Sequence, residues 1–348
     1  GKTFFQGLFF LSGLAVFLCL FSKLFSPITL SRLIASAEVY HAVIDYLDGR
    51  IWGLLFSFPF LALRSFLVGI TRTKALNMAA LTAVLVNIPG NWLLIFQWDM
   101  GITGAAIASS FAEACSLAVL AIHILRKMDK RLYGLYWSFD KGVLRHVCRV
   151  SVWSMFHSFI GVASWLAFFV AIKHLGEMEL AATNVIRSVS TAFFVIVNSF
   201  AATTGSLVSN LLGAGQKAQV IPLCNRIVRL GYAIGFPLVI LALIFYRPII
   251  GIYTESTFLM QIAHLPFMVM LLNYVFALPG YVYMNAVTGT GATRMTFIFQ
   301  LITIVAYQIY LWSISSFSTS LSVYWTAEYL YVILLGLLSV IYLKYKRY

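Results

Sequence analysis

Two carboxylates inside long apolar segments are the side chains of this sequence best placed to do chemistry. Glu113 and Glu328 each follow an alanine in a stretch of mostly apolar residues. An ionisable group in a membrane-spanning segment is energetically expensive and indicates an ion or substrate path. The alternative is structural: each carboxylate lies near a helix end or accepts hydrogen bonds from Ser109, Ser110 or Tyr324, and so holds helices together. The sequence leaves both interpretations open.

A second candidate is a polar stripe in the segment 180–211. Its members recur at spacings of three, four and seven residues and so share one face of a helix: Asn184, Arg187, Ser188, Thr191 and Asn198. Such a stripe in a lipid-embedded helix must point inward. Arg187 could pair with Glu113 or Glu328, or bind an anionic part of a substrate. For Thr191 and Asn198 the alternative is a hydrogen bond to a neighbouring helix, worth about 1 kcal/mol.

Other kinds of site lack the residues that they need. The four cysteines lie singly in apolar segments without C-x-x-C spacing, and His157 and His264 are isolated, so no metal site is predicted. The run from Gly213 to Lys217 lacks the G-x-x-x-x-G-K-S/T pattern of a phosphate-binding loop. With no nucleophile motif either, we expect no enzyme, no bound cofactor and no ATP hydrolysis. The energy for active transport would then come from a gradient of Na⁺ or H⁺.

The composition places these residues in a bilayer. Hydrophobic residues make up 61% of the chain and charged residues 10%, which is too little charge for the surface of a water-soluble domain. Continuously apolar segments such as 302–314 do not fit the alternating polarity of barrel strands. The sequence predicts an all-α polytopic membrane protein with about ten spanning helices, at roughly 3–25, 38–68, 75–97, 102–125, 147–172, 180–211, 218–246, 258–287, 295–315 and 320–343.

The basic residues predict which side of the membrane each loop faces. The formal net charge is +13, but in a membrane protein the positions of Lys and Arg matter more than their sum, so we expect no nucleic-acid partner. Most of them fall in loops on one side, and the other side holds Lys23, Arg32, Lys173 and Arg247. Because basic loops remain in the cytoplasm, we predict a cytoplasmic C-terminus in a plasma membrane such as the bacterial inner membrane.

The sequence repeats itself, with the same special residues at a constant separation in its two halves. Six positions match without a gap, namely Phe56 and Phe276, Pro59 and Pro279, Gly69 and Gly289, Thr73 and Thr293, Lys74 and Arg294, and Trp92 and Trp312. Beyond Trp92 the register shifts, because the next connection is shorter in the second half, and Glu113 then falls on Glu328. A proline inside a helix removes an amide donor and displaces the carbonyl four residues back, so we expect a kink near Leu55 and near Val275. Each kink is either a hinge or a bend without a role in motion.

The repeat predicts two pseudo-symmetric helical bundles. Residues 1–125 would form the first, residues 126–145 a basic cytoplasmic linker, and residues 146–348 the second. The helices at 147–172 and 180–211 have no partner in the first half, so we expect their counterparts before residue 1. The complete protein would then have six helices in each bundle and about twelve spans.

Local motifs resemble those of a known transporter family. The run Gly213-Ala214-Gly215-Gln216-Lys217-Ala218 resembles the loop after the eighth helix of MATE (multidrug and toxic compound extrusion) transporters. The segments 69–73, 86–88, 101–108 and 289–294 (GITRT, VNI, GITGAAIA and GTGATR) resemble landmarks of both lobes of this family. Together they cover nearly the whole chain, and they are specific for the superfamily of MATE exporters and lipid-linked oligosaccharide flippases.

The resemblance implies a secondary antiporter that works by cation-coupled alternating access between two lobes. It would export amphipathic, often cationic drugs or toxic compounds in exchange for Na⁺ or H⁺, as a monomer in the lipid bilayer. Many family members carry one acidic cation-site residue in helix seven and another in helix ten, and the segments 147–172 and 262–288 have none. That site cannot be transferred to this sequence, and the coupling ion stays open.

One alternative function belongs to the same superfamily. A flippase for lipid-linked oligosaccharides has an anionic pyrophosphate substrate and needs several cationic side chains facing its cavity. Arg187 is the one good candidate for such a role. A channel would need a filter motif or a pore-lining ring, and a membrane-embedded enzyme would need clustered catalytic residues. The sequence has neither of these.

Overall fold

All secondary-structure elements are helices in the residues that the computed structural model describes, 1–34 and 36–345. Nine helices in this part of the chain are long and apolar enough to cross a bilayer, and a bent pair of helices brings the number to ten. A helix satisfies its backbone hydrogen bonds internally, which lipid requires because it offers no partners. The predicted all-α polytopic fold with about ten spans is confirmed.

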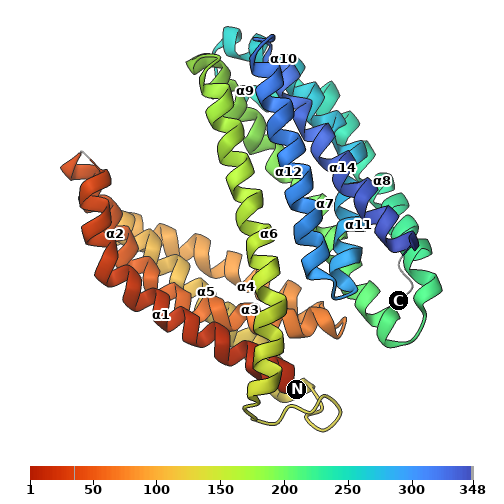
Figure 1. Ribbon diagram of the computed structural model, residues 1–348. Helices are drawn as coiled ribbons and strands as arrows, with labels where there is room; N and C mark the ends of the chain where they lie inside the picture. The colour runs from red at the N-terminus through yellow and green to blue at the C-terminus, as the bar shows by residue number, and fades with distance from the viewer. Residues whose placement is uncertain (35, 346–348) are drawn as a thin grey trace. The chain divides into compact units, whose positions relative to one another are not determined.

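The chain divides into two compact units, Gly1–Cys148 and Arg149–Tyr348, and each is described by itself. The first contains α1 (Lys2–Leu33), α2 (Ala37–Arg50), η1 (Ile51–Gly53), α3 (Leu54–Gly69), α4 (Lys74–Asn91), the π-helical η2 (Trp92–Gln97) and α5 (Gly101–Lys127). Here α3 packs against α1 and α5, and α5 also packs against α4 (Figure 1). A non-helical stretch follows from 128 to 140, within the predicted linker 126–145.

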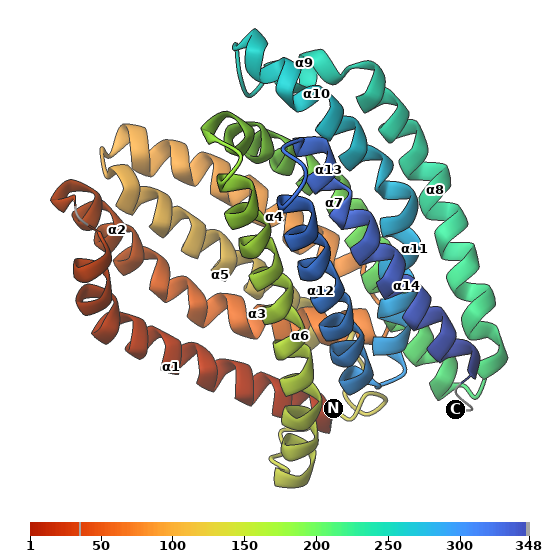
Figure 2. The ribbon, with the colours of Figure 1, turned by 45° about the horizontal axis from the view of Figure 1, so that its top comes forward.

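The second unit is built around α11. Its elements are most of α6 (Lys141–Lys173), then α7 (Glu177–Gly213), η3 (Lys217–Gln219), α8 (Val220–Ile244), α9 (Tyr246–Gly251), α10 (Thr257–Leu272), α11 (Tyr274–Gly289), α12 (Thr293–Ser315), α13 (Leu321–Trp325) and α14 (Ala327–Tyr345). Here α11 packs against α7, α8 and α14 (Figure 2). Phe267, Leu278 and Trp325 are among the large side chains buried in this core.

The sequence repeat has a counterpart in the helix boundaries. The starts of α2 and α10 are separated along the chain by the same distance as Pro59 and Pro279, and so are both ends of α3 and α11. The first residues of α2 and α10 are also capped in the same way: Ser36 accepts a hydrogen bond from the amide of Val39, and Ser256 accepts one from the amide of Leu259. A side-chain acceptor at this position satisfies an amide that has no partner within the helix.

Both halves break their long proline-containing span on the N-terminal side of the proline. In the first unit the 3₁₀ turn η1 separates α2 from α3, and Pro59 lies within α3. In the second unit α10 and α11 meet at Asn273 with a bend of 41°, and Pro279 lies within α11. The hydroxyl of Tyr232 donates a hydrogen bond of 2.5 Å to the carbonyl of Val275, the group that Pro279 leaves without an amide partner.

Close helix packing at glycine fixes α14 against α11. A Cβ added to Gly280 would lie 2.6 Å from the carbonyl oxygen of Val332 in α14, so a larger residue would force the two helices apart. On another side of α11, the hydroxyl of Ser209 in α7 donates a hydrogen bond of 2.7 Å to the carbonyl of Gly289. Small residues at such contacts let membrane helices approach closely. These contacts hold α7 and α14 against α11.

Candidate functional site

Glu113 is neutralised by an arginine of its own unit. The guanidinium of Arg50, the last residue of α2, donates two hydrogen bonds to its carboxylate, of 2.8 Å to Oε2 and 2.5 Å to Oε1. The hydroxyl of Ser57 in α3 donates a third, to Oε2. A two-pronged contact between guanidinium and carboxylate is the strongest of the ordinary ion-pair geometries. Glu113 therefore ties α2 and α3 to α5, as the structural interpretation of this residue requires.

A glycine at the helix break makes room for this ion pair. A Cβ added to Gly53 would lie 2.8 Å from Oγ of Ser110 and 2.9 Å from Oε2 of Glu113. The same Cβ would come closest to Nη1 of Arg50, so a larger residue at this position would disturb the ion pair at its guanidinium first. The side chains of Arg50 and Glu113 keep 31% and 29% of their exposure, so both charges are only partly desolvated.

Glu328, the counterpart of Glu113, has no cation beside it in the described part of the chain. The hydroxyl of Tyr307 in α12 donates a hydrogen bond of 2.9 Å to its Oε1. The residues that correspond by the repeat to Arg50 and Ser57 are Met270 and Ala277, and both line the same cavity as Glu328. The two equivalent carboxylates thus differ in environment. Glu113 has a guanidinium beside it, whereas no cation of the described residues neutralises Glu328.

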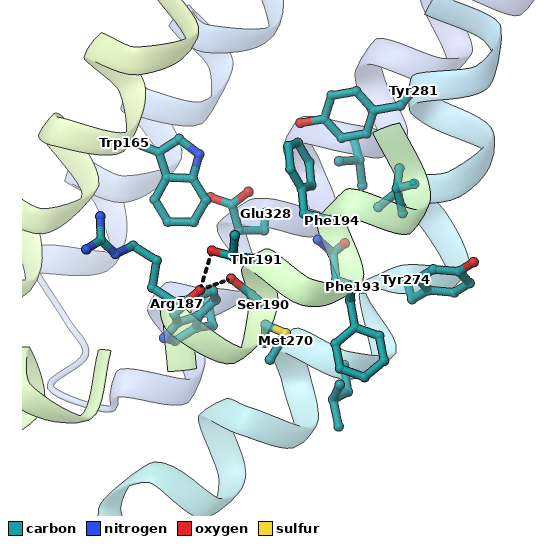
Figure 3. Close-up of a pocket in the computed structure, with 16 residues that line it drawn as sticks. Trp165, Arg187, Ser190, Thr191, Phe193, Phe194, Met270, Tyr274, Tyr281 and Glu328 are labelled. Atoms are coloured by element: carbon teal, nitrogen blue, oxygen red, sulfur yellow. Dashed lines mark hydrogen bonds between the residues drawn. The ribbon is translucent and has the colours of Figure 1, made fainter. Parts of the chain in front are cut away.

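Aromatic side chains surround Glu328 in a cavity of about 280 Å³. Trp165 comes from α6, Phe194 from α7 and Tyr281 from α11 (Figure 3). Trp325 comes from α13. Phe194 and Tyr281 meet edge to face with centroids 5.2 Å apart, and Trp165 and Trp325 do so at 6.4 Å. Ring faces attract cations, and an ionised carboxylate among them would add a negative charge. This cavity is suited to an organic cation with an apolar body.

A second cavity, of about 230 Å³, also reaches Glu328. It shares Trp165, Phe194 and Tyr281 with the first cavity and adds polar side chains of α6, α12 and α14: His157, Ser158, Ser164, Gln300, Tyr307 and Tyr331. The amide nitrogen of Gln300 donates a hydrogen bond of 2.6 Å to the hydroxyl of Tyr331. Nε2 of His157 and Oε1 of Gln300 are buried without a protein partner. Buried polar atoms of this kind normally bind water or an ion.

The polar stripe of α7 bonds mainly to its own helix. The hydroxyls of Ser190 and Thr191 donate to the carbonyl of Arg187, at 2.8 and 2.9 Å, and the amide of Asn184 donates to the carbonyl of Leu180 at 3.1 Å. Arg187, Ser190 and Thr191 line the aromatic cavity, whereas Asn184, Ser188 and Asn198 are exposed on the helix. Thr191 therefore does not make the interhelical hydrogen bond that was one of its two interpretations.

Arg187 pairs with a ring. Its guanidinium carbon lies 5.0 Å from the centroid of the Phe169 ring, and Figure 3 shows the side chain extending away from the carboxylate of Glu328. The expected alternative of an ion pair with Glu328 is not formed, and Glu113 has Arg50 as its partner. Arg187 nevertheless lines the cavity, where it places a positive charge together with the negative charge of Glu328.

Several residues of the site were missed by sequence reasoning. Arg50 could have been recognised from the sequence, because a guanidinium inside a mostly apolar span needs an acidic partner. Tyr307 could also have been recognised, since the repeat places it on Asn87, another polar residue inside a span. The aromatic residues Trp165 and Tyr281 could not, because aromatic side chains are common throughout the chain. In the described residues, no group of three or more His, Cys, Asp or Glu is arranged to hold a metal ion.

Comparison with known proteins supports the fold and adds a family. The model of the MatE family matches residues 1–93 and 154–312. A probable multidrug resistance protein NorM of Photorhabdus laumondii is 25% identical over 252 residues, which is 67% of this chain and 53% of that protein. The multidrug resistance protein NorM of Aliivibrio fischeri is 23% identical over 271 residues, 72% of this chain and 58% of its own length. The chain thus spans a little over half the length of these two curated relatives.

The fold is also that of a solved structure. An outward-facing multidrug resistance MATE family transporter of the MOP superfamily superimposes with a TM-score of 0.88 at 14% sequence identity, and the match covers 99% of this chain and 78% of that one. Identity this low speaks for the fold and leaves the side chains of the site to be interpreted from their own contacts.

Proposed function

Since the chain belongs to the MATE family, we propose that it is part of a secondary antiporter that exports amphipathic, cationic organic compounds by alternating access. In this proposal the protein is a transporter and not an enzyme, and it acts as a monomer. It resides in a plasma membrane of the bacterial inner-membrane type, with its C-terminus in the cytoplasm. Its multi-pass helical fold and its NorM relatives support the assignment.

The observation that carries the proposal is the environment of Glu328. Its carboxylate faces a cavity lined by aromatic rings, and no cation of the described residues neutralises it. The ring faces would hold the flat, apolar part of a substrate, while the carboxylate would balance its positive charge. The same position in the first unit is neutralised by Arg50, so we assign cation binding to Glu328 and a structural role to Glu113.

The coupling ion in this proposal is Na⁺ or H⁺. The second cavity at Glu328 offers hydroxyl and amide oxygens, which are ligands for Na⁺, together with the imidazole of His157, which can transfer a proton. An ion bound there would reach the same carboxylate as the substrate does. Transport would be coupled because the two cations compete for Glu328.

The alternative of a flippase for lipid-linked oligosaccharides receives no such support. An anionic pyrophosphate would be repelled by the carboxylate of Glu328, and Arg187 is the one basic side chain among the residues lining the aromatic cavity. A site for pyrophosphate normally gathers several Arg or Lys side chains. We therefore do not propose this function.

The test is efflux of a fluorescent lipophilic cation from a bacterium that lacks its own pumps. We expect energised cells with the full-length protein to lose the dye, and collapse of either the Na⁺ or the pH gradient to stop the loss and so identify the coupling ion. Glu328→Gln should lower efflux by about tenfold or more, since it removes a charge-assisted contact. Glu255→Gln, the same change in an exposed loop, is the matched control.

Two results would contradict the proposal. If Glu328→Gln, present in membranes at the wild-type level, exported the dye like the wild-type protein, Glu328 would not bind the transported cation. If the wild-type protein exported no lipophilic cation under any gradient, the substrate class itself would be wrong.

A further inference from the structure

The turn that joins α7 to α8 carries a groove that the proposed transport cycle does not use. Its volume is about 420 Å³, and seven residues line it: Leu207, Asn210, Leu211, Gln219, Pro222, Leu223 and Arg226. The lining residues of α7 follow the spacing i, i+3, i+4. The lining residues that follow the turn, in η3 and α8, have the spacing i, i+3, i+4, i+7. Each set therefore lies on one face of its segment, and the two faces meet across the turn. This connection is seen between the green helix α7 and the teal helix α8 in Figure 2.

The lining is amphipathic. Three leucines and Pro222 make the walls apolar, while Asn210, Gln219 and the guanidinium of Arg226 supply hydrogen-bond donors. Arg226 is exposed, and no carboxylate of the described residues lies within ion-pair distance of it. Between Glu179 and Glu255 the sequence contains no acidic residue at all. The α7–α8 hairpin therefore cannot balance the charge of Arg226 from within.

The position of Arg226 along α8 places it at the level of the lipid headgroups. The segment 230–246, between Arg229 and Arg247, contains no charged residue. Its part within α8, residues 230–244, is about 22 Å long at a rise of 1.5 Å per residue, which approaches the thickness of the hydrocarbon core. Arg229 thus lies at one border of that core, and Arg226 lies about one turn further out. At this depth a phospholipid presents its phosphate and the first part of its acyl chains together.

We propose that this groove binds an anionic phospholipid. The phosphate lies on the guanidinium of Arg226, Asn210 and Gln219 donate to headgroup oxygens, and an acyl chain follows Leu207, Leu211 and Leu223. Basic pockets between membrane helices select acidic headgroups on the side of the membrane where anionic lipids accumulate. The apolar walls distinguish this site from one for a dissolved anion, which would leave the leucines in contact with water.

The test compares lipid retention and thermal stability of the purified full-length protein. Detergent-solubilised protein is mixed with micelles of phosphatidylcholine or of phosphatidylglycerol, and bound lipid is counted by native mass spectrometry. We expect the wild-type protein to retain phosphatidylglycerol about fivefold better than phosphatidylcholine and to melt at a higher temperature with the former. Arg226→Gln should abolish this preference, and Arg226→Lys, which keeps the charge, should retain most of it.

The matched control is Arg229→Gln. Arg229 lies about one turn from Arg226 and does not line the groove, so this change removes a charge of the same kind outside the site. It should leave the preference unchanged. Equal losses in Arg226→Gln and Arg229→Gln would overturn the proposal in favour of diffuse attraction between lipid and basic residues. Equal stabilisation by inorganic phosphate in the absence of lipid would also overturn it, because the groove would then be a site for free anions. Should Arg226→Gln fail to fold, Leu223→Asn tests the acyl-chain contact independently: it should lower retention of phosphatidylglycerol, and unchanged retention would overturn the proposal.

Discussion

The two repeated glutamates show how much the neighbours of a residue decide its role. Glu113 and Glu328 occupy equivalent places in their halves, but Arg50 neutralises the former while Met270 stands at the corresponding position near the latter. In a medium of low dielectric constant a paired carboxylate joins helices. An unpaired carboxylate is costly there, and it takes up a proton or binds a cation. In our proposal the difference between the structural and the functional carboxylate thus depends on two replacements, of Arg50 by Met270 and of Ser57 by Ala277.

This interpretation predicts the behaviour of the Arg50 and Glu113 pair. Glu113→Gln and Arg50→Met should each lower the free energy of unfolding by about 2 kcal/mol, because each leaves one partly buried charge without its partner. The double variant should be more stable than the sum of the two losses implies, with a coupling energy of about 1 to 2 kcal/mol. Denaturant unfolding of the purified single and double variants measures this coupling. Strictly additive losses would mean that the ion pair contributes nothing.

At the scale of the helices, each broken span must compensate for its proline. In the second unit the compensation is visible, because the hydroxyl of Tyr232 in α8 donates to the carbonyl of Val275 that Pro279 leaves free. The bend of 41° lies at Asn273, nearer the start of α11 than the proline is. The broken span therefore has a fixed support from the neighbouring helix, and Pro59 and Pro279 stay candidates for hinges.

Tyr232→Phe should lower the free energy of unfolding by about 1 kcal/mol, because the carbonyl of Val275 loses its donor. In a Pro279→Ala background the same change should be nearly neutral, since the restored amide at 279 can donate to that carbonyl. Thermal unfolding of the four proteins in detergent provides the comparison. An equal loss from Tyr232→Phe in both backgrounds would show that the hydroxyl acts through other contacts.

At the scale of the whole molecule, the uneven distribution of basic residues predicts its orientation in the membrane. The α7–α8 turn contains Lys217 and is followed by Arg226 and Arg229, so we assign it to the cytoplasm. By the alternation of spans, we expect the α6–α7 turn on the opposite side. Two adjacent loops on opposite sides provide an internal control for each other.

Labelling of engineered cysteines tests this orientation. In a cysteine-free background, Gln216→Cys should react with a membrane-impermeant maleimide only after cells are opened, and His174→Cys should react in intact cells. Both positions are in connections between helices, so accessibility depends on sidedness more than on burial. The reverse pattern would invert the assigned topology, including the cytoplasmic C-terminus.

The sequence by itself determined the properties that depend on local composition and period. Apolar runs long enough to span lipid predicted the all-α polytopic fold, because the bilayer imposes a length and a polarity on each segment. The match of Pro59 with Pro279 and of Gly69 with Gly289 revealed the duplication without knowledge of any contact. The motifs of both halves indicated the family, which the family match confirmed.

Only the tertiary structure decided which carboxylate is free to bind a cation. Arg50 is separated from Glu113 by 63 residues, and Tyr307 from Glu328 by 21. No periodicity along the chain relates such residues, because their proximity arises from the packing of different helices. The cavity around Glu328 likewise gathers Trp165, Phe194, Tyr281 and Trp325 from four elements. The charge state and the surroundings of a site depend on these distant contacts, and so they had to come from the folded chain.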